Sequence, residues 1–305
     1  MNIWLYVAGF VCLAVFVVMA LRHRFHQRLR QELSPSREPV TELPDLVHLN
    51  CQTVRFATER GRMLEGWWLT GEAAQGQVIL THGWGANRQA LLPLVPMLVA
   101  AGWNVLLFDV RNHGNSDEDT FSSMPRFAED IDAAIAWLNN TQGKCPIALI
   151  GHSVGAAATL LAASRRNDIT AVVSLSSFAH PADMMKRWLV EKGIPFYPLG
   201  WYVLRYVQRV IGYRFDSIAP VDTLTRIHCP VLLVHGDRDT IIPLEDAYTL
   251  ASKTNNAVLR VVPGGHDLSP SIAQHGDELV AFLHDALKPD SDSRHQQLHH
   301  HADYL

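Results

Sequence analysis

The stretch LIGHSVGAAATLLAAS, residues Leu149–Ser164, places a serine between two glycines, after an apolar run and before an alanine-rich run. This pattern predicts a buried strand that turns sharply into a helix, with Ser153 at the turn. Such a turn strains the serine backbone and lifts its hydroxyl above the sheet, while Gly151 and Gly155 relieve the crowding. Serine is a weak nucleophile that needs a base, and the base needs an orienting acid. The pattern alone does not establish that Ser153 is a nucleophile, so an acid and a base have to be found in the rest of the chain.

Two later segments offer the acid and the base. The apolar run CPVLLV is followed by HGDRDTIIP, which holds two aspartates. Asp237 lies in the predicted turn, where it can face solvent or cap the turn. Asp239, two residues later, is the favoured candidate for the acid. His266, in VVPGGHD, follows the last predicted strand, and Asp267 beside it is interpreted as structural. The chain order serine, aspartate, histidine is that of hydrolases with a nucleophile elbow.

An acyl-transfer site also needs two backbone N–H groups for the oxyanion. Val154 follows the serine and begins the predicted helix, where N–H groups are free. The second donor is expected in the loop after QVILT, and Trp84 is the best placed residue of that loop. His82, in the same loop, is interpreted as a brace and not as a second base.

The elements that must position these residues follow a regular alternation. TVRFAT and LEGWWLT, separated by ERGRM, predict a hairpin. Continuous apolar strands then alternate with helical patterns, which indicates a mostly parallel sheet covered by helices on both faces. The domain is expected over residues 48–288.

Residues 180–226 interrupt the alternation with an insertion rich in aromatic residues and methionine. Two short helices over the carboxyl edge of the sheet would form a cap, because open α/β sheets bind ligands at that edge. The alternative is a helical pair packed as ordinary core. Basic side chains lie among the aromatics and suggest docking on anionic lipid headgroups, with a solvated basic face as the competing interpretation. These are Lys186, Arg187, Lys192, Arg205, Arg209 and Arg214.

The N-terminal segment Ile3–Leu21 contains no charge, and four arginines follow within residues 22–30. Nineteen helical residues span roughly 28 Å, close to the thickness of a bilayer's hydrocarbon core. This charge order and the missing A-x-A site favour an uncleaved anchor over residues 1–22 instead of a signal peptide. The positive-inside rule places the rest of the chain in the cytoplasm. Residues 23–47 are expected to form a polar juxtamembrane linker, and 289–305 a disordered, histidine-containing tail.

Composition excludes other classes. The net charge is −4 over 305 residues, and no basic block is interleaved with aromatics, so nucleic acid is not an expected partner. The four cysteines are dispersed without the spacing of a metal site or a disulfide framework. The histidines near the C-terminus could hold a metal adventitiously, but a solvated tail is the favoured interpretation.

Five ordered motifs, THGWGANR, FDVRNHGNSD, GHSVGAA, VHGDRDTIIP and GGHD, together resemble the α/β-hydrolase family. The resemblance covers about residues 50–287 and is closest to the Bem46-like and the monoacylglycerol-lipase or serine-aminopeptidase-like branch. It implies an eight-stranded mostly parallel sheet, Ser153 as nucleophile, Asp239 as acid, His266 as base, and neither cofactor nor metal. Ala156 stands where many relatives carry a second glycine.

These observations predict a membrane-anchored serine hydrolase that cleaves a carboxylic ester through an acyl-enzyme. The expected substrate is a small, hydrophobic or lipid-like acyl compound, and the bilayer is contacted through residues 3–21. Thioester or amide cleavage would use the same triad. A membrane-tethered binding protein without activity is the alternative from another class.

Overall fold

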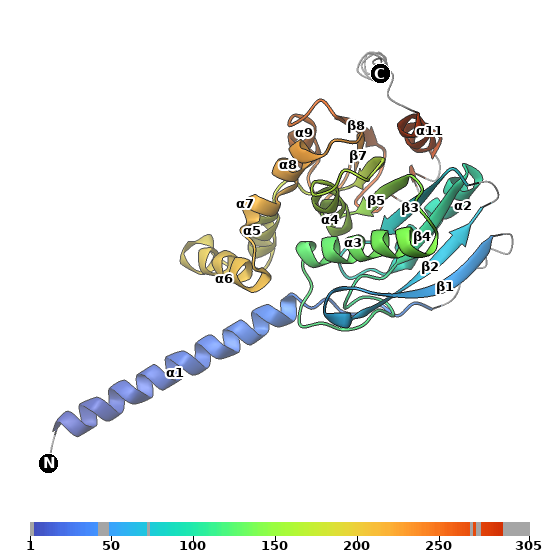
Figure 1. The fold of residues 1–305 in the computed structure, drawn as a ribbon. Helices are drawn as coiled ribbons and strands as arrows, with labels where there is room; N and C mark the ends of the chain where they lie inside the picture. The colour runs from blue at the N-terminus through green and yellow to red at the C-terminus, as the bar shows by residue number, and fades with distance from the viewer. Residues whose placement is uncertain (1–2, 42–48, 72–73, 269–270, 273–275, 289–305) are drawn as a thin grey trace.

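The computed structural model describes residues 3–41, 49–71, 74–268, 271–272 and 276–288 and contains one eight-stranded sheet (Figure 1). The strands are β1 (Asn50–Ala57), β2 (Met63–Thr70), β3 (Gly76–Thr81), β4 (Trp103–Phe108), β5 (Ile147–His152), β6 (Ala171–Leu175), β7 (Val231–Gly236) and β8 (Ala257–Val262).

The strand order is β1-β2-β4-β3-β5-β6-β7-β8. β1 and β2 form the predicted hairpin, and β2 runs antiparallel to both of its neighbours. Every pairing from β4 to β8 is parallel. The prediction of an eight-stranded, mostly parallel sheet is therefore confirmed, and the carboxyl ends of β3, β5, β6, β7 and β8 meet at one edge.

Both faces of the sheet are buried, as the continuous apolar strands require. In β3, Ile79 faces one hydrophobic core while Val78 and Leu80 face the other. The first core contains α3 (Met124–Thr141), α4 (Val154–Ala163) and Leu250 of α9 (Leu244–Ala251). The second contains α2 (Val95–Ala100) and α11 (Gly276–Leu287). Two short 3-10 helices, η1 (Glu59–Gly61) and η2 (Arg88–Leu94), join these elements.

The insertion between β6 and β7 is helical. It consists of α5 (Pro181–Glu191), η3 (Phe196–Gly200), α6 (Trp201–Ile211), α7 (Phe215–Ile218), α8 (Pro220–Thr223) and η4 (Leu224–Arg226). Because the insertion leaves from the end of β6, it lies at the carboxyl edge of the sheet, as expected for a cap (Figure 1). Asp246 of α9 fixes its base: Oδ2 accepts from the N–H of Ala179 at 3.0 Å and pairs with Arg187 at 2.8 Å.

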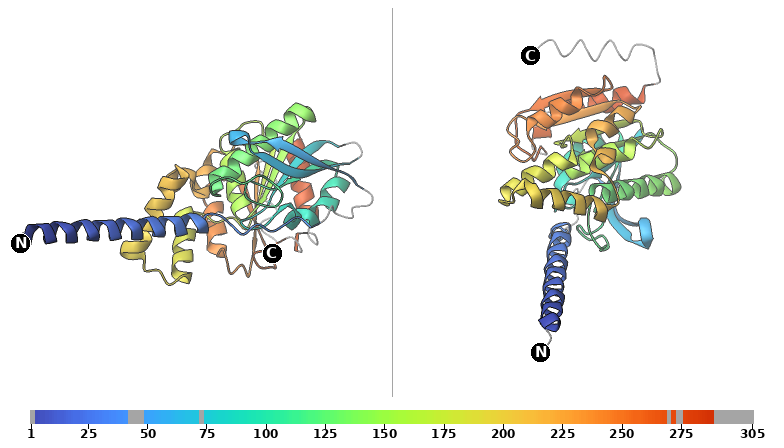
Figure 2. Two further views of the ribbon diagram at one scale, coloured as in Figure 1. Left: turned by 90° about the horizontal axis from the view of Figure 1, so that it is seen from below. Right: turned by 90° about the vertical axis from the view of Figure 1, so that its left-hand side faces the viewer.

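Helix α1 (Ile3–Glu32) projects from the domain and is longer than the sequence patterns indicated (Figures 1 and 2). It is long and apolar enough to cross a membrane, as an anchor or as a signal sequence. The first ten residues of the predicted linker, from residue 23, continue the helix. The reason is packing, since Phe25, Leu29 and Leu33 contact the first core. Residues 42–48 and the predicted tail at 289–305 lie outside the described residues.

Candidate active site

Ser153 sits at the turn from β5 into α4, as its flanking glycines predict. Its backbone has φ 56° and ψ −120°, a conformation that residues other than glycine seldom adopt. The N–H of Ser153 donates to the carbonyl of Leu175 on β6 at 2.8 Å, which pins the turn to the sheet. A Cβ at Gly155 would lie 2.3 Å from the carbonyl oxygen of His82, so only glycine allows α4 to approach the loop after β3 this closely.

The acid and base candidates lie in contact across two loops. Nδ1 of His266, after β8, lies 2.8 Å from Oδ2 of Asp239, after β7. Oδ1 of Asp239 accepts from the N–H groups of Ile241 and Ile242, each at 2.9 Å. Burial favours the neutral acid, but the bond to His266 and these two backbone bonds outweigh it and lower the pKa of Asp239 to about 2. Asp239 is therefore an ionised carboxylate that fixes the histidine ring.

Asp237, the competing acid, has a different role. Its Oδ1 accepts from the N–H of Gly264 at 2.9 Å and ties the β7 loop to the β8 loop. The two loops touch because Gly236 has no side chain: a Cβ there would lie 2.4 Å from the carbonyl oxygen of Gly265. Asp237 thus caps the turn and helps bring Asp239 to His266 without contacting the histidine ring itself.

His152 is a site residue to which the sequence patterns assigned no role. Its Nε2 lies 2.8 Å from the carbonyl oxygen of His266, and the two rings are 4.9 Å apart. Burial lowers the pKa of His152, so the ring is neutral and donates this bond through Nε2–H. His152 therefore ties the serine turn to the histidine loop 114 residues away. It occupies a variable position of the G-x-S-x-G pattern, and nothing local in the sequence marks it.

The contacts of the described residues include no hydrogen bond from Oγ of Ser153 to His266. Nδ1 of His266 is engaged by Asp239, so Nε2 is the ring nitrogen that remains for the serine. Catalytic hydrogen bonds of this kind often tighten only when the substrate is bound.

The two predicted oxyanion donors flank Ser153. Val154 is the first residue of α4, so its N–H has no partner inside the helix. A Cβ at Gly83 would lie 3.2 Å from Cβ of Ser153, which places the turn that carries Trp84 against the serine. The N–H of Gly85 donates to Nε2 of His113 at 3.2 Å and fixes this turn. Among the described contacts, the Trp84 N–H donates to no other residue.

Two buried histidines brace the turn, as expected for His82. Its Nδ1 donates to the carbonyl of Gly83 at 2.7 Å, and its Nε2 accepts from the N–H of Val110 at 3.2 Å. Burial is the main cause that lowers the pKa of His82 to about 4 and the pKa of His113 to about 3. Both rings are neutral near pH 7, and their hydrogen bonds define which nitrogen carries the proton.

Because of these two buried histidines, we expect the free energy of unfolding to decrease in mild acid. Because each folded pKa is lowered from its ordinary value, the unfolded chain binds more protons below about pH 6.5. The stabilisation is present above that pH and is lost as the pH falls toward 4. Each histidine should contribute a slope of about 1.4 kcal/mol per pH unit in the free energy of unfolding. Urea unfolding of the full chain in detergent, between about pH 7 and pH 5, measures it.

The control for that measurement is an exposed histidine. His113→Asn keeps a side-chain N–H that can donate to the carbonyl of Arg111, as Nδ1 of His113 does. The substitution should reduce the slope of the free energy of unfolding against pH by about 1.4 kcal/mol per pH unit, the contribution of one proton. His228→Asn, at an exposed position, should leave the slope as in the wild type. Equal slopes for the wild type and His113→Asn would contradict the assignment of a neutral, buried His113.

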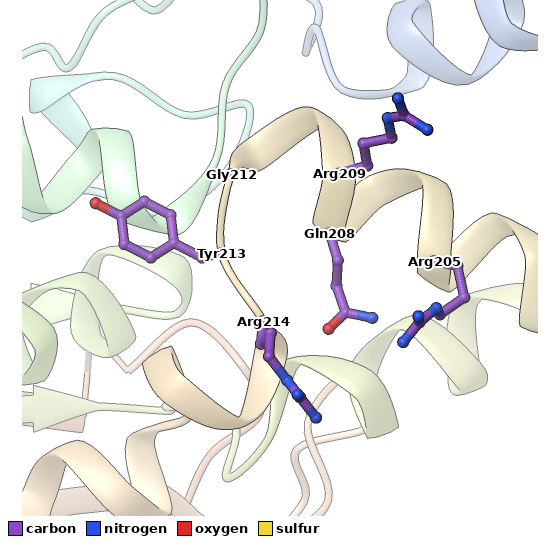
Figure 3. Close-up of a pocket in the computed structure, with 6 residues that line it drawn as sticks. All are labelled: Arg205, Gln208, Arg209, Gly212, Tyr213 and Arg214. Carbon is purple, nitrogen blue, oxygen red and sulfur yellow. The ribbon is translucent and has the colours of Figure 1, made fainter.

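A surface hollow lies in the cap and away from these residues (Figure 3). It is lined by Arg205, Gln208, Arg209, Gly212, Tyr213 and Arg214. Ser153, Asp239 and His266 do not border it, so the hollow lies apart from the predicted triad.

The comparisons with known proteins agree with the fold. Residues 72–209 match the family model described as serine aminopeptidase, S33. The uncharacterized protein Rv2307c of Mycobacterium tuberculosis is 30% identical over 249 residues, 79% of this chain and 81% of that protein. The uncharacterized protein YfhR of Escherichia coli is 29% identical over 256 residues, 79% and 83% of the two chains.

Two solved structures show the same fold. The Pyrococcus furiosus esterase Pf2001 has a TM-score of 0.69 at 24% identity and covers 84% of this chain and 100% of its own. A thioesterase domain from the curacin biosynthetic pathway has a TM-score of 0.57 at 20% identity, with 76% and 99% covered. The eight-stranded sheet, the serine turn and these matches together place the chain in the α/β-hydrolase family, as a hydrolase of the esterase, thioesterase or peptidase type.

Proposed function

We propose that this protein is a serine hydrolase that cleaves a carboxylic ester through an acyl-enzyme on Ser153. The observation that carries the proposal is the part-buried Asp239–His266 pair, held at 2.8 Å, with His152 linking it to the strained serine turn. A serine nucleophile, an ionised acid and a histidine base, in this chain order, are the components of nucleophilic acyl transfer.

The contacts support a definite division of labour. Nδ1–H of His266 donates to Asp239, which leaves the lone pair of Nε2 to take the proton of Ser153. Oγ of Ser153 then attacks the ester carbonyl, and the N–H groups of Trp84 and Val154 stabilise the oxyanion. His266 returns the proton to the leaving alcohol. A water molecule, deprotonated by His266, next attacks the acyl-enzyme, and His266 returns that proton to Oγ of Ser153 as the carboxylic acid leaves.

We propose a hydrophobic acyl substrate and a membrane location. Helix α1 places the domain beside a bilayer if it stays in the mature protein, and the arginines after Leu21 favour a cytoplasmic domain with a single membrane pass. The same machinery would cleave a thioester or an amide, and the matching family model carries the name of an aminopeptidase. Ester, thioester and amide forms of one acyl group, assayed side by side, distinguish these options.

A fluorophosphonate probe tests the proposal directly. The wild-type chain in detergent should be labelled covalently, whereas Ser153→Ala should not be. Labelling that is equal in both forms would assign the reaction to another residue. A wild-type chain that stays unlabelled would instead support a membrane-tethered binding protein that has kept the fold.

His152 should act as a positioning residue for the base. His152→Phe keeps a ring against His266 but removes the N–H that holds its carbonyl. A displaced base is expected to lower kcat about 10²-fold with little change in KM. His152→Gln, which can donate from a similar position, should recover part of kcat. If His152→Phe lowers the melting temperature yet keeps kcat, the residue is structural only.

A further inference from the structure

The cap carries an exposed apolar tip next to helix α1. We propose that this tip lies on the surface of an anionic phospholipid bilayer and forms a second membrane contact of the protein. The cap tip is defined here by Val190 at the end of α5, Tyr197 and Leu199 of η3, and Trp201 and Tyr202 of α6. The inference depends on α1 crossing the bilayer and does not depend on the proposed catalytic activity.

Helix α1 and helix α6 are joined by specific contacts. Nε2 of His26 lies 2.6 Å from the hydroxyl of Tyr202, and the His26 ring stacks on Tyr206 at 4.0 Å. Nε of Arg30 donates to the hydroxyl of Tyr206 at 3.1 Å, and Leu29 is buried. These contacts fix the height of α6 along α1.

That height corresponds to the headgroup layer. His26 follows Leu21, the last residue of the uncharged run, by five residues. At 1.5 Å per residue it lies about 8 Å beyond the hydrocarbon edge, where the polar headgroup region is about 5–8 Å thick. Figures 1 and 2 show that the cap, with α5 and α6, reaches along α1 toward its N-terminal end, which is the end that would enter the bilayer.

The side chains of the tip are those of an interface. Val190 is 77% exposed, Tyr197 74% and Trp201 50%, so the tip presents several large apolar side chains that the described chain leaves uncovered. Exposed apolar groups of this kind mark interaction sites. Tyr and Trp are the residues that concentrate at the boundary between headgroups and hydrocarbon. Apolar side chains on an exposed helix end therefore lie at the depth where a bilayer accepts them.

The positive charge near the cap tip favours anionic lipid as its partner. Residues 192–214 contain four basic side chains and no acidic one, and residues 22–31 contain four arginines and no acidic one. Within the described part of the chain, neither Arg205 nor Arg209 pairs with a carboxylate. In Figure 3 the side chains of Arg205, Arg209 and Arg214 point in different directions. This arrangement suits a charged surface with many phosphates better than a pocket for one. A second copy of this chain that docked through the same surface would bring equal positive charge and be repelled.

A fluorophore at the tip tests the contact in the full chain. Cys12, Cys51, Cys145 and Cys229 are replaced with alanine, and NBD is attached through Leu199→Cys or, as the control, through Tyr248→Cys on α9, which is also exposed. Each protein is reconstituted in vesicles of phosphatidylcholine with or without phosphatidylglycerol. We expect a blue-shifted emission and strong quenching by doxyl-labelled lipid at position 199 only, and both should be larger with phosphatidylglycerol.

Charge reversal provides the decisive comparison. Arg205→Glu with Arg209→Glu should return the label at position 199 to the water-exposed signal of position 248. The matched pair Lys144→Glu with Lys253→Glu, at exposed positions away from the cap, should leave the quenching unchanged. A water-exposed label at position 199 in anionic vesicles would overturn the proposal, and so would quenching that is unchanged by the charge reversal. A blue shift without quenching by lipid would also overturn it and would indicate contact with a second copy.

Discussion

Ser153→Ala is expected to lower kcat for an ester substrate by about 10⁴- to 10⁶-fold, because the variant loses the nucleophile while the oxyanion donors and the substrate contacts remain. The folded chain should survive the change, since the hydroxyl of Ser153 makes no described hydrogen bond that holds the turn and the backbone bond to Leu175 is retained. Steady-state kinetics on the purified full chain measure the loss. Retention of more than a small fraction of kcat would contradict the role of Ser153.

A second substitution at the same position separates chemistry from strain. Ser153→Gly also removes the nucleophile, but glycine adopts φ 56° without the steric cost that serine and alanine bear there. Such strained positions cost about 1–3 kcal/mol. Ser153→Gly should therefore melt at a higher temperature than Ser153→Ala while being equally inactive. A lower melting temperature for the glycine variant would show that the turn is not strained in solution.

Asp239→Asn is expected to lower kcat by about 10³- to 10⁴-fold, with the chain still folded. The amide oxygen can accept from the N–H groups of Ile241 and Ile242, as Oδ1 of Asp239 does. The amide nitrogen then faces Nδ1 of His266 as a donor and forces the proton onto Nε2. The histidine in that tautomer cannot accept the proton of Ser153. The loss should appear in kcat far more than in KM.

The competing aspartate is the matched control for this experiment. Asp237→Asn keeps an acceptor for the N–H of Gly264 and does not touch the histidine ring, so kcat should stay within a few-fold of the wild type. The hydrogen bonds that each carboxylate accepts lower the pKa of both Asp237 and Asp239. Since the pKa of Asp239 is lowered to about 2, its stabilising charge is present above pH 3.9 and is lost only as the pH falls toward 2. Equal losses of kcat in both variants would contradict the assignment of Asp239.

The fold could be predicted in detail from the sequence because its signals are local. Apolar runs of five or six residues alternate with helical patterns, and the hairpin is marked by alternation on both sides of a turn. The local sequence does not distinguish Asp237 from Asp239 as the acid, since both follow the same strand. The distinction depends on the close approach of Gly236 to Gly265, which results from the three-dimensional arrangement of β7 and β8.

Two other features were not predicted from the sequence patterns, for different reasons. The partner of His152 is a backbone carbonyl 114 residues away. Every residue has a backbone carbonyl, so no residue type in the sequence marks this partner. The extension of α1 did leave a signal, because Phe25, Leu29 and Leu33 repeat every four residues on one helix face. The surrounding arginines and the prolines after Ser34 made the segment resemble a linker. Only the first core, against which those apolar residues pack, shows why the helix continues.

The double contact of Asp246 determines how the cap can move. This carboxylate holds the N–H of Ala179 and the guanidinium of Arg187, and its helix begins at Leu244, five residues after Asp239. The first turns of α5 and the acid-bearing loop therefore share one fixed point. Since His26 and Arg30 hold α6 to α1 as well, the cap is attached both beside the acid-bearing loop and beside the N-terminal helix. A displacement of the cap therefore has to break one of these two sets of contacts.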